Sequence, residues 1–210
     1  MSSPPSAASS PADGPGIAIR RAAPGDAGAI ARVRIDGWRT AYRGLVPAAA
    51  LDGMRVDAST ALWEKVLAAA SDSASVFVAT RGDEVVAFAA GNMLAEPRFG
   101  LDAELTAIYV RPEFQHVGLG RRLLVAVVEA QRRQGATGII VWTIVGNKPA
   151  RAFYEALGAE LLLEQAFQWD GMDLKEAGYG WRDLDALDSA CRAGQVLPRA
   201  DLPQKNRRAG

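Results

Sequence analysis

Residues 104–134 constrain the fold of this chain more than any other segment. Their pattern predicts a strand over 104–110, a short connection, and a helix that begins at Gly118 and runs to Gln134. Gly118 and Gly120 lie where the strand passes into the helix, and glycine lets a backbone approach a ligand closely. The first N–H groups of a helix lack helical partners and carry partial positive charge. The junction therefore predicts a site suited to a pyrophosphate.

Two common nucleotide motifs fit this junction poorly. The dinucleotide fingerprint is G-x-G-x-x-G, whereas the order here is Gln115-x-x-Gly118-x-Gly120. A Walker loop requires Lys and then Ser or Thr after its last glycine, but Arg121 and Arg122 follow Gly120. A third interpretation, in which the glycines only relieve steric crowding, stays open from this segment alone.

The context of the junction favours one family. The run Gln115-His116-Val117-Gly118-Leu119-Gly120 resembles Q/R-x-x-G-x-G/A, the acyl-CoA-binding signature of the GNAT superfamily of N-acetyltransferases. A second run, 145–158, resembles the family's strand-five-to-helix-four block, with Asn147 as a helix cap and Tyr154 further along. The two runs follow the family's order and usual separation. The resemblance covers approximately Ile17 to Leu184.

This resemblance implies an α/β (α+β mixed sheet) fold, in which a central mixed, mostly antiparallel sheet is flanked by helices and splayed between strands 4 and 5. The residue patterns agree, because strands and helices alternate and 139–145 is an unbroken apolar run typical of a strand buried on both faces. We predict a single domain over 17–184. Residues 1–16 are rich in Ser, Pro, Ala and Gly and predict a disordered tail, and 185–210 predict a polar C-terminal tail.

The resemblance also implies acetyl-CoA as the co-substrate. Backbone groups of Ile108 and Val110 would pair with the pantetheine amides as an additional strand would. The other predicted cofactor contacts are Gln115, His116, Val117, Gly118, Leu119, Gly120, Arg121, Asn147 and Tyr154. We expect His116 to act through its backbone rather than as a base. The sequence predicts no metal site.

Acetyl transfer to an amine requires a group that takes a proton from the amine and one that gives a proton to the leaving thiolate. By resemblance, Tyr154 is the acid and Glu104 is the candidate base. Four strand residues, from Glu104 to Ile108, span about 13 Å, which favours a water relay over direct contact. Asp102 and Glu96 are rival carboxylates with weaker positions.

The acceptor is expected to be a small-molecule amine or a peptide N-terminus. Trp38 and Tyr42 lie four residues apart and share a helix face, so they predict either an aromatic acceptor wall or core. Arg39 and Arg43, on the neighbouring face, would hold an acceptor carboxylate or remain solvated.

The bulk composition excludes other classes of partner. Lys plus Arg equals Asp plus Glu at 24 each, which gives no electrostatic case for nucleic acid or an anionic membrane. The single Cys191 suits a reducing, cytoplasmic compartment. The sequence leaves open whether the protein is a homodimer. It also leaves open a non-catalytic acyl-CoA-binding module, which would need the glycine turn but neither Glu104 nor Tyr154.

Overall fold

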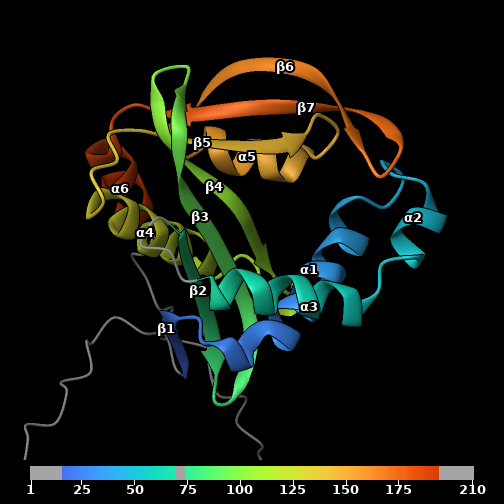
Figure 1. Ribbon diagram of the computed structural model, residues 1–210. Coiled ribbons are helices and arrows are strands. Elements are labelled where there is room, and N and C mark those ends of the chain that lie inside the picture. Colours follow the sequence, from blue (N-terminus) through green and yellow to red (C-terminus); the bar gives the residue numbers. More distant parts are fainter. Residues whose placement is uncertain (1–15, 70–73, 194–210) are drawn as a thin grey trace, which may run out of the picture.

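The computed structural model describes residues 16–69 and 74–193, which form one seven-stranded sheet with helices on both faces (Figure 1). The strand order is β1-β2-β3-β4-β5-β7-β6. All neighbouring pairs are antiparallel except the parallel pair β4 and β5. The predicted α/β fold with a mixed, mostly antiparallel sheet is therefore confirmed. The strands are β1 (Ile17–Arg21), β2 (Ala74–Arg81), β3 (Glu84–Arg98), β4 (Leu101–Val110), β5 (Ile139–Ile144), β6 (Glu160–Trp169) and β7 (Met172–Trp181).

Helices α1 and α3 cover one face of the sheet, called here the α1 face, and α4 and α6 pack on the other, the α4 face (Figure 1). Short 3-10 helices precede α1 (Pro24–Asp26) and follow β4 (Pro112–Phe114). The α-helices are α1 (Ala27–Ala41), α2 (Ala48–Asp52), α3 (Val56–Ala68), α4 (Leu119–Arg132), α5 (Lys148–Glu155) and α6 (Leu184–Ala193).

Helix α4 is fixed on the sheet by one apolar face. Leu123, Leu124, Val127 and Val128 are buried there, as their helical spacing predicts. Burying one such side chain contributes about 1.5–3 kcal/mol. This packing holds the N-terminus of α4 at a constant place beside the end of β4.

A β-bulge in β4 opens the centre of the sheet. Ala90 lies opposite Ala107 whereas Gly91 lies opposite Leu105, so Thr106 is an extra residue without a partner on β3. The parallel pairing of β4 with β5 ends at Leu105. A bulge bends its strand, and β4 and β5 separate beyond this point. The splay predicted between strands 4 and 5 is confirmed.

The folded domain continues beyond the predicted boundary, because α6 lies mostly within 185–210. The Asp183 carboxylate accepts hydrogen bonds of 2.9 Å from two backbone N–H groups of the first turn, which begins the helix. Leu187 and Cys191 are buried in the core shared with α4. Burial raises the pKa of the Cys191 thiol to about 11. The prediction of a polar tail from residue 185 is thus wrong as far as Ala193.

Two further points concern the ends and the helices. The predicted tail over 1–16 lies, except for Gly16, outside the described residues, as does the segment after Ala193. The short helix α2 was not expected from the sequence. None of the helices within 16–69 and 74–193 combines the length and apolarity that crossing a membrane requires.

Candidate active site

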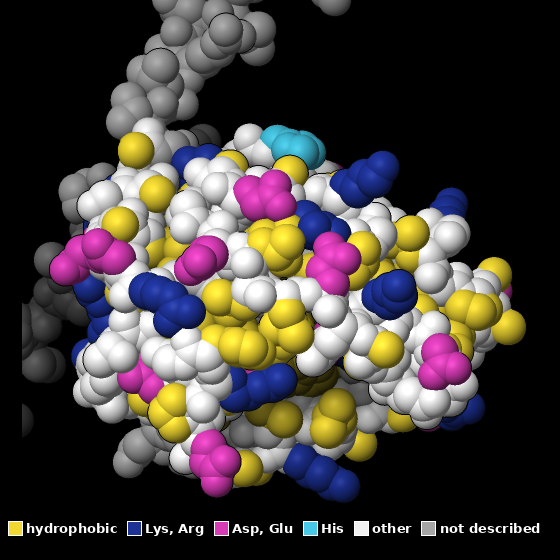
Figure 2. Space-filling model, turned by 90° about the horizontal axis from the view of Figure 1, so that it is seen from above, with side chains coloured by type: hydrophobic (Ala, Val, Ile, Leu, Met, Phe, Trp, Pro, Cys, Tyr) yellow, Lys and Arg dark blue, Asp and Glu magenta, His cyan; other side chains and the backbone are white. Residues whose placement is uncertain are grey.

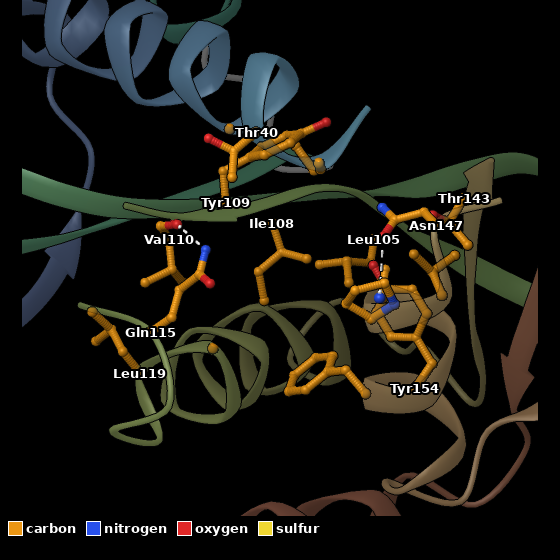
Figure 3. Close-up of a pocket in the computed structure, with 18 of the residues that line it drawn as sticks. Thr40, Leu105, Ile108, Tyr109, Val110, Gln115, Leu119, Thr143, Asn147 and Tyr154 are labelled. Atoms are coloured by element: carbon orange, nitrogen blue, oxygen red, sulfur yellow. Dashed lines mark hydrogen bonds between the residues drawn. The ribbon is translucent and has the colours of Figure 1, made fainter. Parts of the chain in front are cut away.

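A cavity of about 640 Å³ lies where β4 and β5 part. Figure 3 shows Thr40 and Tyr109 on one side of β4, and Ile108, Leu119 and Tyr154 on the other. The cavity therefore passes through the sheet, from the N-terminal ends of α4 and α5 on the α4 face to the end of α1 on the α1 face.

The free edge of β4 faces this cavity. The Arg111 N–H donates to the Val86 carbonyl at 3.0 Å. In an antiparallel pair, residues alternately bond to the partner strand and face away from it. The N–H and C=O groups of Ile108 and Val110 therefore point away from β3. Since the pairing with β5 ends at Leu105, they point into the opening.

Gln115 partly occupies this edge. Its side-chain amide donates to the Val110 carbonyl at 2.9 Å (Figure 3). This bond ties the glycine turn to the end of β4. It leaves the Val110 N–H and both backbone groups of Ile108 for an extended ligand.

The glycine turn presents backbone donors at the start of α4. His116 and Gly118 both have positive φ, at 62° and 81°. The helical bond nearest the start of α4 runs from the Arg122 N–H to the Gly118 carbonyl at 3.2 Å. The N–H groups of 119–121 therefore lack helical partners and carry the positive end of the helix dipole. Val117 is 65% exposed and does not line the cavity.

The second glycine serves a different purpose. A β-carbon on Gly120 would lie 3.4 Å from the Phe153 ring, so glycine at this position lets α4 and α5 approach each other closely. Arg121 lines the cavity, and its guanidinium also donates to the Ala190 carbonyl of α6 at 3.4 Å.

Tyr154 lies in the wall of the cavity with only 5% of its surface exposed. Its ring meets Phe153 and Trp181 edge to face, at 5.5 and 5.9 Å. The Asn147 side chain accepts a 3.3 Å bond from the backbone N–H three residues on and so caps α5, as predicted (Figure 3). Burial raises the pKa of Tyr154 well above its usual range, and Tyr42 adds to this. The phenol therefore holds its proton at neutral pH.

The sequence missed Tyr109, which lines the α1-face side of the cavity. A β-carbon on Gly37 would come within 2.5 Å of its ring, so only glycine fits beside it. Burial raises the pKa of Tyr109, and both Tyr42 and Tyr154 interact with it electrostatically. Three phenols thus gather at the opening. One pattern in the sequence could have revealed Tyr109: side chains alternate along a strand, so Tyr109 points to the opposite face of β4 from Ile108.

Thr143 is a second residue that the sequence missed. Its side chain lines the cavity and is 5% exposed (Figure 3). Its hydroxyl has no hydrogen-bond partner within the described part of the chain. A buried hydroxyl without a partner is costly, so a bound ligand that bonds to it would remove that cost.

Glu104 does not line the cavity. It pairs with Asn92 of β3 just before the bulge, at the closed end of the opening. Ala103 and Leu105 point into the core under α4, so alternation turns Glu104 toward the α1 face. Burial raises the pKa of Glu104, Arg98 opposes this, and Glu176 adds to it.

Other predicted or rival residues lie elsewhere. Trp38 is buried and stacks on Trp169, with 4.3 Å between the ring centres, so it belongs to the core between α1 and the β6–β7 hairpin. Tyr42, by contrast, lines the cavity. Partial burial alone would raise the pKa of Asp102, but hydrogen bonds from Thr137 and Gly138 outweigh it and lower that pKa. Asp102 thus fastens the loop before β5.

An opened mixed sheet, a free strand edge and a helix N-terminus at the opening define the class of acyl-CoA-dependent transferases that the sequence resembles. The profile of the acetyltransferase (GNAT) family matches residues 40–159, which include the glycine turn and the α5 block. The chain belongs to the GNAT acetyltransferase family.

Individual relatives agree with this assignment. The uncharacterized N-acetyltransferase YuaI of Bacillus subtilis is 34% identical over 176 residues, which cover 81% of this chain and 96% of YuaI. The structure of PaiA N-acetyltransferase from Thermoplasma acidophilum, in complex with coenzyme A, has a TM-score of 0.62 at 20% identity and covers 77% of this chain and 97% of that one. The structure of yncA from Salmonella typhimurium, with its cofactor acetyl-CoA, has a TM-score of 0.59 at 20% identity. It covers 79% of this chain and 92% of the yncA chain. The two structures show that the fold is shared.

Proposed function

We propose that this protein is an acetyl-CoA-dependent N-acetyltransferase that moves an acetyl group to a primary amine of a small molecule or peptide. The transfer occurs by direct attack in a ternary complex. The observation that carries the proposal is the cavity that passes through the sheet between β4 and β5. Two ligands can meet there from opposite faces without sharing an entrance.

Acetyl-CoA would occupy the α4 face. Its pyrophosphate would accept hydrogen bonds from the N–H groups of 119–121, where the helix dipole favours negative charge. Its pantetheine arm would pair with the backbone of Ile108 and Val110, the free edge of β4. The thioester would then lie at the opening beside Tyr154.

The chain supplies the two proton transfers that the reaction requires. The neutral amine nitrogen attacks the thioester carbon and forms the C–N bond, and the C–S bond then breaks with its electron pair passing to sulfur. The Tyr154 hydroxyl donates a hydrogen bond and then its proton to that sulfur. The proton lost by the amine passes through a water to Glu104. A raised pKa suits Glu104 to this role, because it brings the basicity of the carboxylate closer to that needed near neutral pH.

Calorimetric titration with acetyl-CoA beside NAD and ATP tests the cofactor, and thiol release with a panel of amines tests the transfer. We expect acetyl-CoA alone to bind, and at least one amine to stimulate thiol release. Binding of NAD or ATP instead would refute the proposal. Binding of acetyl-CoA without release for any amine would favour the non-catalytic acyl-CoA-binding module.

A pair of tyrosine variants tests the mechanism. Tyr154→Phe should lower kcat about a hundredfold while acetyl-CoA binds as before, since general acid catalysis contributes that order of effect. Tyr179→Phe is the matched control, because this buried hydroxyl bonds to Glu155 at 2.6 Å and Arg151 at 2.8 Å, away from the cavity. It should lower stability and leave kcat unchanged. Equal kcat in Tyr154→Phe and wild type would remove Tyr154 from the mechanism.

A further inference from the structure

A tryptophan forms a platform on the α1 face next to the opening. Trp142 of β5 lines the cavity, and a β-carbon on Gly178 of β7 would come within 2.7 Å of its ring. Glycine at 178 therefore leaves the space in which the indole rests on the sheet. The top view of the molecule shows hydrophobic side chains gathered around a hollow, with acidic and basic side chains dispersed around it (Figure 2).

Strand register and alternation place two carboxylates on the same face as Trp142, one on each side of it, although neither lines the cavity. Glu176 is half-buried two residues before Gly178, and the Gln165 amide donates to it at 2.8 Å. Within 16–69 and 74–193, Glu176 forms no salt bridge. Glu104 lies on the same face, on the other side of Trp142, and its charge interacts unfavourably with that of Glu176. A cation placed over Trp142 would relieve this repulsion.

A cation of the chain itself already uses the ring. The Arg98 guanidinium, from the β3–β4 hairpin, lies 4.8 Å from the centre of the Trp142 ring. Arg98 is exposed, and it forms neither a hydrogen bond nor a salt bridge with any residue of the described ranges. A cation–π contact at an exposed site contributes about 0.5–1 kcal/mol, and the charge of Arg98 also attracts that of Glu104. A ligand cation over the ring would replace both interactions.

We propose that the acceptor is an amine with a second cationic group, as in a terminal diamine, and that Trp142 and Glu176 bind this second group. The ring provides a cation–π surface and the carboxylate a charge-assisted hydrogen bond. The reacting amine would then lie toward Glu104 and the opening. This inference rests on the proposed acetyl transfer and adds the class of substrate to it.

Three acceptors that each contain five carbons test the proposal: pentylamine, its diamine analogue cadaverine, and its carboxylate analogue 5-aminopentanoate. The wild-type protein should acetylate cadaverine with a kcat/KM about tenfold above that of pentylamine, and 5-aminopentanoate most slowly. Equal rates for cadaverine and pentylamine would overturn the proposal. A preference for 5-aminopentanoate would also overturn it, because Arg98 would then anchor the substrate.

Variants assign the preference to the platform. Glu176→Gln should raise the KM for cadaverine about tenfold and leave that for pentylamine unchanged. Trp142→Leu changes the wall of the cavity, so its expected effect is an about tenfold smaller preference for cadaverine over pentylamine. Arg98→Ala should lower the KM for cadaverine, because it removes the cation that competes for the Trp142 ring. Asp173→Asn is the matched control: Asp173 lies on the same strand and bonds to Gln168 at 2.7 Å, but points to the other face.

Binding measurements separate this proposal from the acetyl transfer itself. In the presence of coenzyme A, calorimetry should show cadaverine binding about tenfold more tightly to wild type than to Glu176→Gln. If this difference appears without thiol release, the transfer reaction is wrong and the diamine site stands. If wild type and Glu176→Gln bind cadaverine equally, the diamine site is wrong whatever the turnover.

Discussion

Replacing Gly118 with alanine tests the glycine turn most directly. Gly118 has a φ of +81° and nothing within 4 Å of an added β-carbon, so backbone strain is the only local effect of the change. A non-glycine residue in the left-handed region costs about 1–2 kcal/mol. Part of the strain would persist and lower stability, and part would relax by a rotation of φ that turns the N–H groups of 119–121 away from the cofactor.

The expected result combines the two effects. Losing one hydrogen bond to a charged phosphate costs about 1.5–3 kcal/mol, so the Kd for acetyl-CoA should rise about ten- to a hundredfold. The Tm should fall by about 2–8 °C, since 1 kcal/mol corresponds to about 2–4 °C for a domain of this size. Calorimetric titration measures the first and a thermal melt the second.

Gly158→Ala is the matched control for Gly118→Ala. Gly158 follows α5, has a φ of +79° and also has open space around an added β-carbon. It should lose a similar amount of stability and keep its affinity for acetyl-CoA. Wild-type affinity in Gly118→Ala would show that the left-handed turn is not what binds the cofactor.

Three further predictions concern the base, the last helix and the cap. The raised pKa of Glu104 means that the folded state holds its proton more tightly than the unfolded chain, so its contribution to stability is lost as pH rises through the folded pKa. In Glu104→Gln, the free energy of unfolding should no longer fall over this pH range, and the profile of kcat/KM against pH should lose its acidic limb. An unchanged pH–rate profile would exclude Glu104 as the base. Leu187→Ala should lower the free energy of unfolding by about 2–5 kcal/mol in urea, because Leu187 is 1% exposed; a change below about 0.5 kcal/mol would place α6 outside the cooperative fold. Asn147→Ala should cost about 1 kcal/mol of stability in the same assay and reduce kcat by misplacing Tyr154, whereas a neutral effect would mean that the cap is dispensable.

The sequence predicted the elements whose pattern is strong and local. The apolar face of α4, the buried run of β5 and the cap at Asn147 follow from spacing that each segment carries within itself. The glycine turn was found for the same reason, because Gly118 marks a positive φ that few other residues adopt.

The features that the sequence did not reveal depend on contacts between distant segments. Nothing in Leu105-Thr106-Ala107 marks Thr106 as the extra residue, because the bulge exists only relative to Gly91 of β3. At 91, an added β-carbon would lie 2.8 Å from the Glu104 carbonyl, and only the folded structure shows this close approach. Helix α6 did carry a local signal, since Asp183 caps it and Leu187 and Cys191 share its buried face. Its charged residues concealed that pattern.

The short pairing of β4 with β5 has a thermodynamic consequence. Three residue pairs join these strands, fewer than any other neighbouring pair in the described sheet. The N-terminal and C-terminal halves of the sheet thus share little backbone hydrogen bonding. A ligand paired along β4 would reinforce this junction, and at a hundred times its Kd it would add about 2.7 kcal/mol to the stability of the native state. In a cell, the supply of cofactor would then set the fraction of molecules that are unfolded and open to proteolysis, as well as the rate of the reaction.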